Sequence, residues 1–427
     1  MKLKLQIMSG MFILAAVLFS APHQVQADAV TEWNLIAVNT INASTPPRAA
    51  PVSFMDMAMV HLAVFDAVNA IDPQFEKYHV DIPGASGSPE AAVAKAAHDV
   101  LVHLFPAQAA SLLTQYQLFL ANRGIAPNDP GVNVGATAAA GIIALRANDG
   151  RFPANPPPYL GGTELGQWRP TDSLIGNPPS PLPFSPMLVP WVANVVPFAL
   201  KSGDQYRASP PPKLRSKEYA KAYNEAKTIG ARFNSSRTAE ETDFALFFAL
   251  NYGAVWNRVA RDLATAHVSN LIASARLFAL MNVSMADAGI TAWDTKIAFN
   301  FWRPITAIRF GDQDGNPDTE LDPTWQPLIN TPNYPDHTSG ANNATASATR
   351  ALSLFFGTNE MDFTVRTTNA AAVQQSRSYT RFTDAQEDVV VARIYQGIHF
   401  RFADEDGRKQ GRHVAQWVFG HILRPLD

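Results

Sequence analysis

The stretch "VSFMDMAMVHLAVFDAVNAI" (residues 52–71) indicates the class of fold. Its apolar residues recur at the spacing that places them on shared faces of a helix. The stretch therefore predicts a helix, and the sequence on either side of it follows the same pattern.

Further along the chain, "SPEAAVAKAAHDVLVHLF" (88–105) predicts a second helix, with Ser88 as its cap and Pro89 in its first turn. We see no internal repeat and no run of alternating strands. The sequence thus predicts an all-α fold built of helical bundles, with further helices over residues 107–122, 132–148, 216–232, 238–288, 292–301, 341–356, 384–400 and 408–423.

Residues 151–213 differ in composition, because they hold 15 of the chain's 32 prolines. Proline at this density cannot sustain helices or central strands. The segment also contains aromatic residues, which a disordered linker would lack. We expect an ordered, irregular wrap that lies over the helices.

The composition excludes several classes of function. The chain has 427 residues, a net charge of −3 and no cysteine. A slightly acidic protein lacks the basic face that nucleic acid requires. Without cysteine there are no disulfides, thiolate metal sites or cysteine nucleophiles.

The N-terminus has the pattern of a Sec-type signal peptide. Lys2 and Lys4 precede an apolar run that ends in a small-residue cleavage pattern, Val25-Gln26-Ala27. The alternative is a buried N-terminal helix. The leader reading predicts a secreted or periplasmic protein with no membrane insertion after cleavage, since no later segment looks apolar enough to span a bilayer.

The predicted organisation has four parts: a leader (1–27), an N-terminal helical half (28–150), the proline-rich wrap (151–213) and a second helical half (214–427). The sequence is also compatible with a homo-oligomer.

The first fragment that could carry chemistry is "WDTKIAFNFWRP" (293–304). Lys296 and Arg303 are seven residues apart, which is two helical turns, so we expect both on one face of a helix that ends near Pro304. Cations at this spacing are usually solvated surface. Their apolar neighbours here indicate that at least one needs a buried anionic partner.

The second fragment is "YPDHTSGANNATASATRALSLFF" (334–356), where Thr338 or Ser339 can cap the helix that follows. Free N–H groups at such a helix start, around Gly340, favour an anion. An ordinary cap explains the same residues equally well.

The third fragment, "ARIYQGIHFRFADEDGRKQGR" (392–412), carries Arg393 and His399 near one end of a predicted helix. A histidine there is by itself more often structural. Together, however, the three fragments supply two arginines, a lysine, a helix start and a histidine. These groups can hold a tetrahedral oxyanion, with imidazole bonding its central atom.

The order and spacing of these residues resemble the three-part signature of vanadium-dependent haloperoxidases and type-2 phosphatidic acid phosphatases. The fragments "HLAVFDAVNAID" (61–72) and "ALRANDGR" (144–151) also resemble the first half of secreted bacterial haloperoxidase relatives. The resemblance implies an all-α fold with two helix bundles around the anion.

By position, the resemblance implies that vanadate, or phosphate as an alternative occupant, is held by Lys296, Arg303, Ser339, Gly340 and Arg393. It makes His399 the axial vanadate ligand or, in a phosphatase, the nucleophile. Trp293 and Tyr334 take the places of halide-pocket residues.

Two positions depart from the family pattern. Ala341 stands where the family keeps an acid–base histidine, and His337, Asn342 or Asn343 are the conceivable replacements. The aspartate expected four residues after the axial histidine is Ala403, so Asp404 or Asp406 would have to serve.

Three functions follow. The first is a haloperoxidase that uses hydrogen peroxide and a halide. The second is a periplasmic acid phosphatase that forms a phosphohistidine from a phosphate ester. The third is a degenerate member that binds an oxyanion with weak or no turnover. We place the haloperoxidase first, because a metal ion as Lewis acid lessens the need for the missing histidine.

Overall fold

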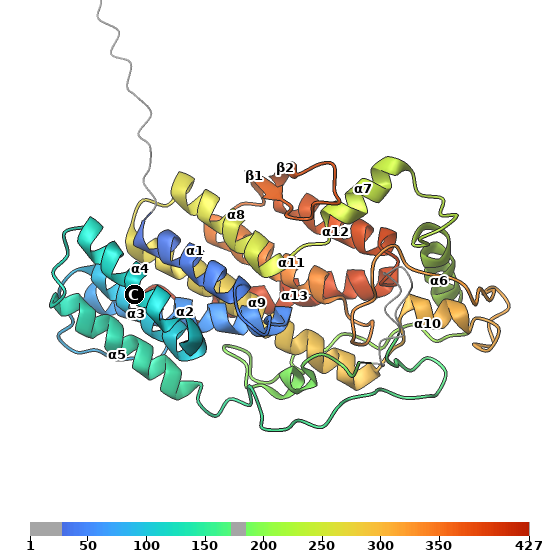
Figure 1. Ribbon diagram of the computed structural model, residues 1–427, viewed down its shortest axis with the longest axis horizontal. Coiled ribbons are helices and arrows are strands. Elements are labelled where there is room, and N and C mark those ends of the chain that lie inside the picture. The colour runs from blue at the N-terminus through green and yellow to red at the C-terminus, as the bar shows by residue number, and fades with distance from the viewer. Residues whose placement is uncertain (1–27, 172–184, 427) are drawn as a thin grey trace, which may run out of the picture.

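The computed structural model describes residues 28–171 and 185–426, and the predicted leader lies outside them. Figure 1 shows an elongated molecule whose regular secondary structure is almost entirely helical, so the all-α prediction is confirmed. Among the described residues the exception is one two-stranded antiparallel sheet, formed by β1 (Glu360–Arg366) and β2 (Ser376–Arg381).

The N-terminal half is a bundle of five helices, α1 (Ala29–Asn42), α2 (Ala50–Ile71), α3 (Pro89–Leu104), α4 (Ala109–Asn122) and α5 (Pro130–Leu145). The predicted start of α3 is confirmed, since the Ser88 hydroxyl accepts a hydrogen bond from the Ala91 N–H at 3.2 Å. The sequence analysis did not predict α1, which begins directly after the Asp28 cap.

The second half contains α6 (Lys217–Ile229), α7 (Ala239–Phe247), α8 (Tyr252–His267), α9 (Leu271–Phe299), α10 (Pro304–Arg309), α11 (Gly340–Phe356), α12 (Phe382–Tyr395) and α13 (Arg401–His421). The prediction of one helix over 238–288 is wrong. Asn251 and Asn270 each cap a new helix with a side-chain oxygen, at the starts of α8 and α9.

Helices α2 and α9 form the centre of the molecule and pack against each other. By length and composition both could cross a membrane, contrary to the expectation that no later segment is apolar enough. Within the structure, 89% of the apolar window of α2 and 83% of that of α9 are buried. Here they are core helices, and their apolar surface is covered by neighbouring helices and the wrap.

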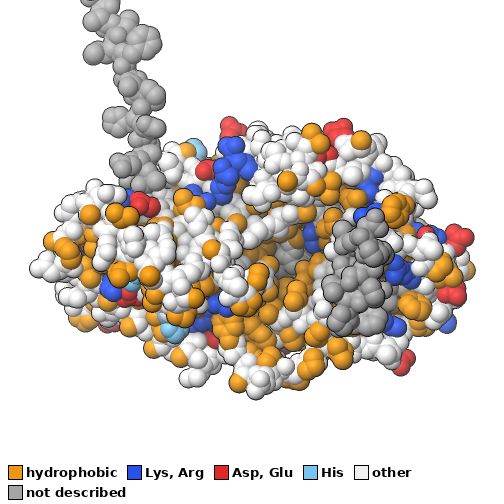
Figure 2. All heavy atoms as spheres, in the orientation of Figure 1, with side chains coloured by type: hydrophobic (Ala, Val, Ile, Leu, Met, Phe, Trp, Pro, Cys, Tyr) orange, Lys and Arg blue, Asp and Glu red, His pale blue; other side chains and the backbone are white. Residues whose placement is uncertain are grey.

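The proline-rich segment is an irregular wrap in its described parts, 151–171 and 185–213, with one short 3-10 turn at Pro190–Asn194. Figure 2 shows hydrophobic side chains gathered along the lower edge of the molecule, where the wrap runs in Figure 1. The buried carboxylate of Asp287 on α9 anchors it, accepting the N–H groups of Phe198, Ala199 and Leu200 at 2.6–2.9 Å.

Candidate functional site

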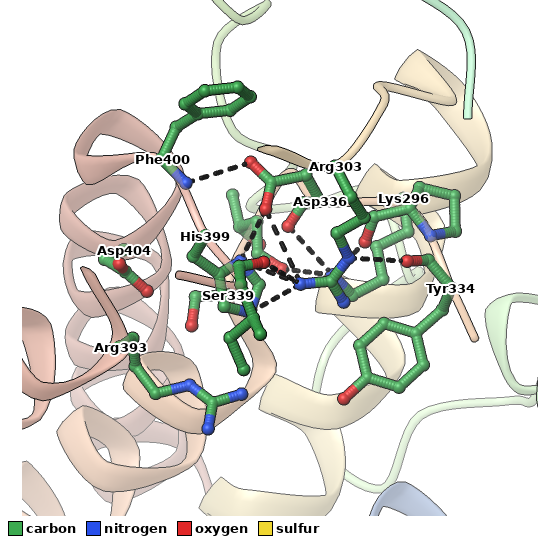
Figure 3. A network of polar contacts seen from close by, with 12 residues as sticks. Lys296, Arg303, Tyr334, Asp336, Ser339, Arg393, His399, Phe400 and Asp404 are labelled. Carbon is green, nitrogen blue, oxygen red and sulfur yellow. Dashed lines mark hydrogen bonds and ion pairs between the residues drawn. The ribbon is translucent and has the colours of Figure 1, made fainter. Parts of the chain in front are cut away.

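The predicted site residues converge from three regions of the chain (Figure 3). They come from the end of α9 and the turn after it, from the loop that leads into α11, and from the last turn of α12 with the turn that follows it. Arg393 is 7% exposed, and four of the others are 0% exposed, namely Lys296, Arg303, Ser339 and His399. Tertiary packing thus places several charges in one buried cluster.

Lys296 and Arg303 do not share a helix face, and that prediction is wrong. Helix α9 ends at Phe299, and Asn300 turns the chain with a left-handed backbone (φ 44°). Arg303 is the N-cap residue of α10. The wrap fixes this turn, because the Trp168 N–H donates to the Asn300 carbonyl at 2.7 Å and the Trp302 N–H donates to the Gly166 carbonyl at 2.8 Å.

The Lys296 ammonium organises the loop that leads into α11. It donates to the carbonyl oxygens of Pro335, Asp336 and Thr338 at 2.7, 3.1 and 2.6 Å. Burial lowers the pKa of Lys296, and the charge of Arg303 lowers it further. Three carbonyl acceptors nevertheless match the three N–H donors of an ammonium group. In this structure Lys296 therefore contributes its charge to the site while its donors hold the loop.

The two arginines carry donors that the described residues leave unused. Arg303 donates through Nε to the Tyr334 carbonyl (2.8 Å) and through Nη1 to the Ile398 carbonyl (2.6 Å), whereas its buried Nη2 contacts no described acceptor. Arg393 donates through Nη1 to Gln396 (2.7 Å), and its buried Nε is likewise unused. Buried guanidinium donors require acceptors, so this arrangement favours a bound anion.

His399 lies in the turn after α12, four residues beyond the helix end, and not in the helix expected over 384–400. Its Nδ1 lies 2.7 Å from the Asp336 carboxylate. Burial lowers the pKa of His399 well below its usual value, and Arg303, Arg393 and Lys296 add to that effect. The ring is therefore neutral, with the Asp336 carboxylate as the group nearest to Nδ1, and Arg303 Nη1 lies 3.3 Å from Nδ1 and 3.1 Å from Nε2.

Asp336 was not among the residues predicted from the sequence. The expected carboxylate partner of His399 lay on its C-terminal side, whereas Asp336 comes from the loop before α11. The signal was present, since Asp336 is three residues before Ser339 in the fragment already selected. Burial raises the pKa of Asp336 to about 7 against the lowering effects of Arg303 and Lys296.

The start of α11 forms the floor of the site. Ser339 is its N-cap residue, although its side chain makes no capping hydrogen bond, and Gly340 is the first helical residue. A Cβ on Gly340 would meet the Trp293 ring at 3.4 Å. Ala341 follows and is half-buried. The N–H groups of this first turn have no acceptor within the helix, as at any helix start.

Trp293 and Tyr334, the predicted halide-pocket residues, lie together. Their ring centroids are 5.1 Å apart, and the Tyr334 ring lies 4.9 Å from the Lys296 ammonium and 4.8 Å from the Arg303 guanidinium. His337 is placed differently. Its ring packs beside Phe299 and Phe402, and its Nε2 lies 2.9 Å from the Ser209 carbonyl of the wrap.

The two carboxylates proposed as substitutes after His399 have other partners. Asp404 accepts from the Asn342 amide at 2.8 Å, and Asp406 pairs with Lys409 at 3.0 Å. The carboxylate that contacts His399 is Asp336, so neither substitution is needed to orient the imidazole.

Comparison with known proteins agrees with this geometry. Residues 276–427 match the family described as the VCPO second helical-bundle domain. The chain is 26% identical over 399 residues to the vanadium chloroperoxidase of Curvularia inaequalis. The alignment covers 75% of this chain and 64% of the chloroperoxidase. A bacterial vanadium-dependent iodoperoxidase superposes with a TM-score of 0.79 at 23% identity, covering 94% of this chain and 99% of that one.

The chain is similar in sequence to a vanadium chloroperoxidase and has the fold of the vanadium haloperoxidases. A bacterial vanadium-dependent chloroperoxidase shares that fold too, with a TM-score of 0.70 at 18% identity over 87% of this chain and 92% of that one. The suspected resemblance is thereby confirmed. The chain spans about two thirds of the chloroperoxidase with which its sequence aligns.

The site suits the vanadate on which the haloperoxidases named above depend. Three buried cations, Lys296, Arg303 and Arg393, face two buried carboxylates, Asp336 and Asp404, and two of the guanidinium nitrogens are unused. An oxyanion would balance the remaining charge and accept from those nitrogens. Because Nδ1 of His399 faces Asp336, Nε2, which lies 3.1 Å from Arg303 Nη1 in this structure, is the nitrogen that could bond such an anion.

Proposed function

We propose that this protein is a vanadium-dependent haloperoxidase that uses hydrogen peroxide and a halide. The observation that carries the proposal is the combination of unused, buried guanidinium donors on Arg303 and Arg393 with a neutral imidazole held by Asp336. This set of groups supports an oxyanion bonded to a nitrogen ligand. The sequence relatives and structural neighbours support the peroxidase over the other two functions considered.

In the proposed enzyme, Arg303, Arg393 and the first turn of α11 bind vanadate, and His399 Nε2 is its ligand. Bound vanadate would act as a Lewis acid that activates hydrogen peroxide for halide oxidation. Asp336 would keep His399 in the Nδ1–H tautomer, so that the Nε2 lone pair, which in this structure lies 3.1 Å from Arg303 Nη1, can bond the vanadate instead. Lys296 holds the loop 335–338 in place, and its charge lowers the cost of binding an anion.

We also propose that Trp293 and Tyr334 form the halide pocket. Their rings lie beside two cations, Lys296 and Arg303, at 4.8–5.9 Å. A halide could use the positive charge and the apolar surface together. Replacing Trp293 with Phe should alter the ranking of iodide and bromide as substrates more than it alters vanadate binding.

The experiment compares the purified mature protein with and without vanadate. Iodide and bromide oxidation are measured beside hydrolysis of an activated phosphate ester. We expect halide oxidation that needs vanadate and is lost in His399→Ala, with an unchanged far-UV helical spectrum. Ester hydrolysis without halide oxidation would instead support the phosphatase. If the protein shows neither activity, that result would support the degenerate member.

The proposed cellular location is the periplasm or the exterior, supported by the leader pattern of residues 1–27. Expression of the full chain in a bacterial host, followed by mass spectrometry of the recovered protein, should find an N-terminus near Asp28. An uncleaved chain in the cytoplasm would contradict this. The four-part division of the chain and the homo-oligomer remain predictions.

A further inference from the structure

The buried carboxyl of Asp404 has no role in the function proposed above. It is 0% exposed and lies in the first turn of α13, facing the start of α11. Its Oδ1 accepts from the Asn342 amide at 2.8 Å, and the same amide contacts the Ser339 hydroxyl at 3.2 Å. The Ser339 hydroxyl also lies near the carboxyl and lowers the pKa of Asp404. Oδ2 is buried and contacts no donor among the described residues.

Asp404 belongs to the charge cluster of the site. Figure 3 places it on the side of the network where Arg393 and Ser339 lie. Burial raises the pKa of Asp404 well above its usual value, which the charge of Arg393 and the bonds from Ser339 and Asn342 only partly offset. The titratable and charged groups within electrostatic reach of it are Arg393, Asp336, Lys296, Arg303, Arg401, Glu405 and Tyr252.

The protonation state of Asp404 decides what Ser339 can do, because a serine hydroxyl has a single donor. When Asp404 is ionised, Ser339 donates to the carboxylate and has no proton left for an anion. A carboxylate would also repel an oxyanion at the same helix start. When Asp404 is protonated, it can donate to the Ser339 oxygen, and Ser339 can then donate to the anion.

We propose that Asp404, acting through the Ser339 hydroxyl, supplies to a bound oxyanion the proton that a histidine at position 341 supplies in the family pattern. The carboxyl proton passes to Ser339 Oγ while the Ser339 proton passes to an oxygen of the anion. A proton taken up from the solvent then restores the carboxylic acid. Asp404 is thus a positioning residue that holds the proton, and Asn342 keeps it in place.

The first test uses sulfate as the probe, because sulfate stays a dianion throughout the pH range in which the protein is folded. Its affinity is measured by calorimetry between about pH 5 and pH 9. Binding that requires a protonated Asp404 weakens as the pH rises, by up to about tenfold per pH unit above the pKa of the carboxyl. Asp404→Asn mimics the protonated acid, so its sulfate affinity should not show the part of the pH dependence that comes from the titration of Asp404.

The matched control is Asp406→Asn, which removes a partly exposed carboxylate two residues away on the same helix. It should retain the wild-type dependence of sulfate affinity on pH. In Ser339→Ala the sulfate affinity should no longer depend on the protonation of Asp404, because the hydroxyl that links the carboxyl to the anion is gone. If Asp404→Asn does not fold, calorimetry of the wild-type protein in two buffers of different ionisation enthalpy still counts the protons taken up with sulfate.

Equal pH dependence in the wild type and Asp404→Asn would overturn the proposal, as would wild-type protein that takes up no proton or does not bind sulfate. These outcomes do not depend on turnover, so they are distinct from a failure of the proposed haloperoxidase function.

The second test measures turnover and rests on that proposed function. With vanadate and iodide, Asp404→Asn should keep its anion and lose about 10²-fold in rate, the low end of general acid catalysis. Adding Ala341→His in that background should recover activity, because the histidine restores a proton donor beside the anion. Asp404→Asn protein that turns over at the wild-type rate would contradict the proposed proton path.

Discussion

At the scale of single residues, the site is defined by which donors remain unused. Lys296 uses its donors on three loop carbonyls, so it acts on the anion by charge. Arg303 and Arg393 each keep a buried nitrogen without an acceptor among the described residues. The arginines are therefore the residues whose removal should affect anion binding most directly.

We expect vanadate or phosphate to raise the melting temperature of the wild type in a dose-dependent way, because ligands that bind the folded state stabilise it. Arg303→Ala or Arg393→Ala should abolish most of that shift. Arg408→Ala is the control, since Arg408 forms a loose ion pair with the exposed Glu387 at 3.9 Å. A wild type that does not respond to millimolar anion would refute the site.

His61 gives a second prediction at this scale. It is buried in the N-terminal half, where burial and the charge of Arg261 lower its pKa from 6.5 to about 3. Below pH 6.5 the His61 imidazole binds a proton in the unfolded chain, whereas in the folded chain it stays neutral down to about pH 3. Stability from this group is therefore lost as the pH falls from 6.5 toward 3, at about 1.4 kcal/mol per pH unit.

Denaturant unfolding at several pH values checks this prediction. His61→Gln should flatten the acid side of the stability curve, whereas the exposed His103→Gln should leave the curve unchanged. Parallel curves for the wild type and His61→Gln would show that His61 is not kept neutral by the fold.

At the scale of elements, the packing of α13 against the start of α11 positions the site. A Cβ on Gly407 would lie 2.5 Å from the Ser339 carbonyl oxygen, and one on Gly411 would lie 2.2 Å from that of Asn343. These glycines are four residues apart, so they form a smooth stripe on one face of α13. The stripe lets the two helices approach closely enough for Asp404 to reach Asn342.

Gly407→Ala should therefore push α13 away from Ser339 and weaken anion binding by at least about tenfold, the effect of roughly 1.4 kcal/mol. Gly420→Ala lies in the same helix and meets nothing within 4 Å, so it should leave binding unchanged and raise helix stability slightly. The thermal shift with phosphate measures both. Equal shifts in the two variants would mean that the helix contact does not set the site.

At the scale of the whole molecule, the wrap joins the two halves to the site. Its backbone pairs with the Asn300 turn, its Leu188 carbonyl accepts from Trp293, and its Ser209 carbonyl meets His337. Buried carboxylates hold its backbone N–H groups in place of regular secondary structure. Asp287 is the main example, because its carboxylate accepts hydrogen bonds from the backbone N–H groups of residues 198–200.

Asp287→Asn should loosen the wrap, because an amide nitrogen then faces backbone donors that need acceptors. We expect a loss of about 1–3 kcal/mol in the free energy of unfolding and faster proteolysis within 185–213. Asp72→Asn is the control, since Asp72 makes an exposed contact with Gln74. Unchanged cleavage in Asp287→Asn would show that the wrap is held elsewhere.

The sequence by itself determined the helical class, because the spacing of apolar residues fixes which face of a helix is buried. It also determined the chemistry of the site residues and the irregular wrap, since residue type and proline density act locally. The hairpin of β1 and β2 escaped prediction because its strands are largely polar, with Phe363, Val365 and Tyr379 as the side chains turned toward the core.

Only the tertiary structure decided how those residues meet. The left-handed turn at Asn300 separates Lys296 from Arg303, although their spacing fits one helix face. Asp336 and His399 are 63 positions apart in the sequence and 2.7 Å apart in space. Local patterns cannot encode such a pair, because its distance follows from how α9, α11 and α13 pack together, and that packing is a property of the whole chain.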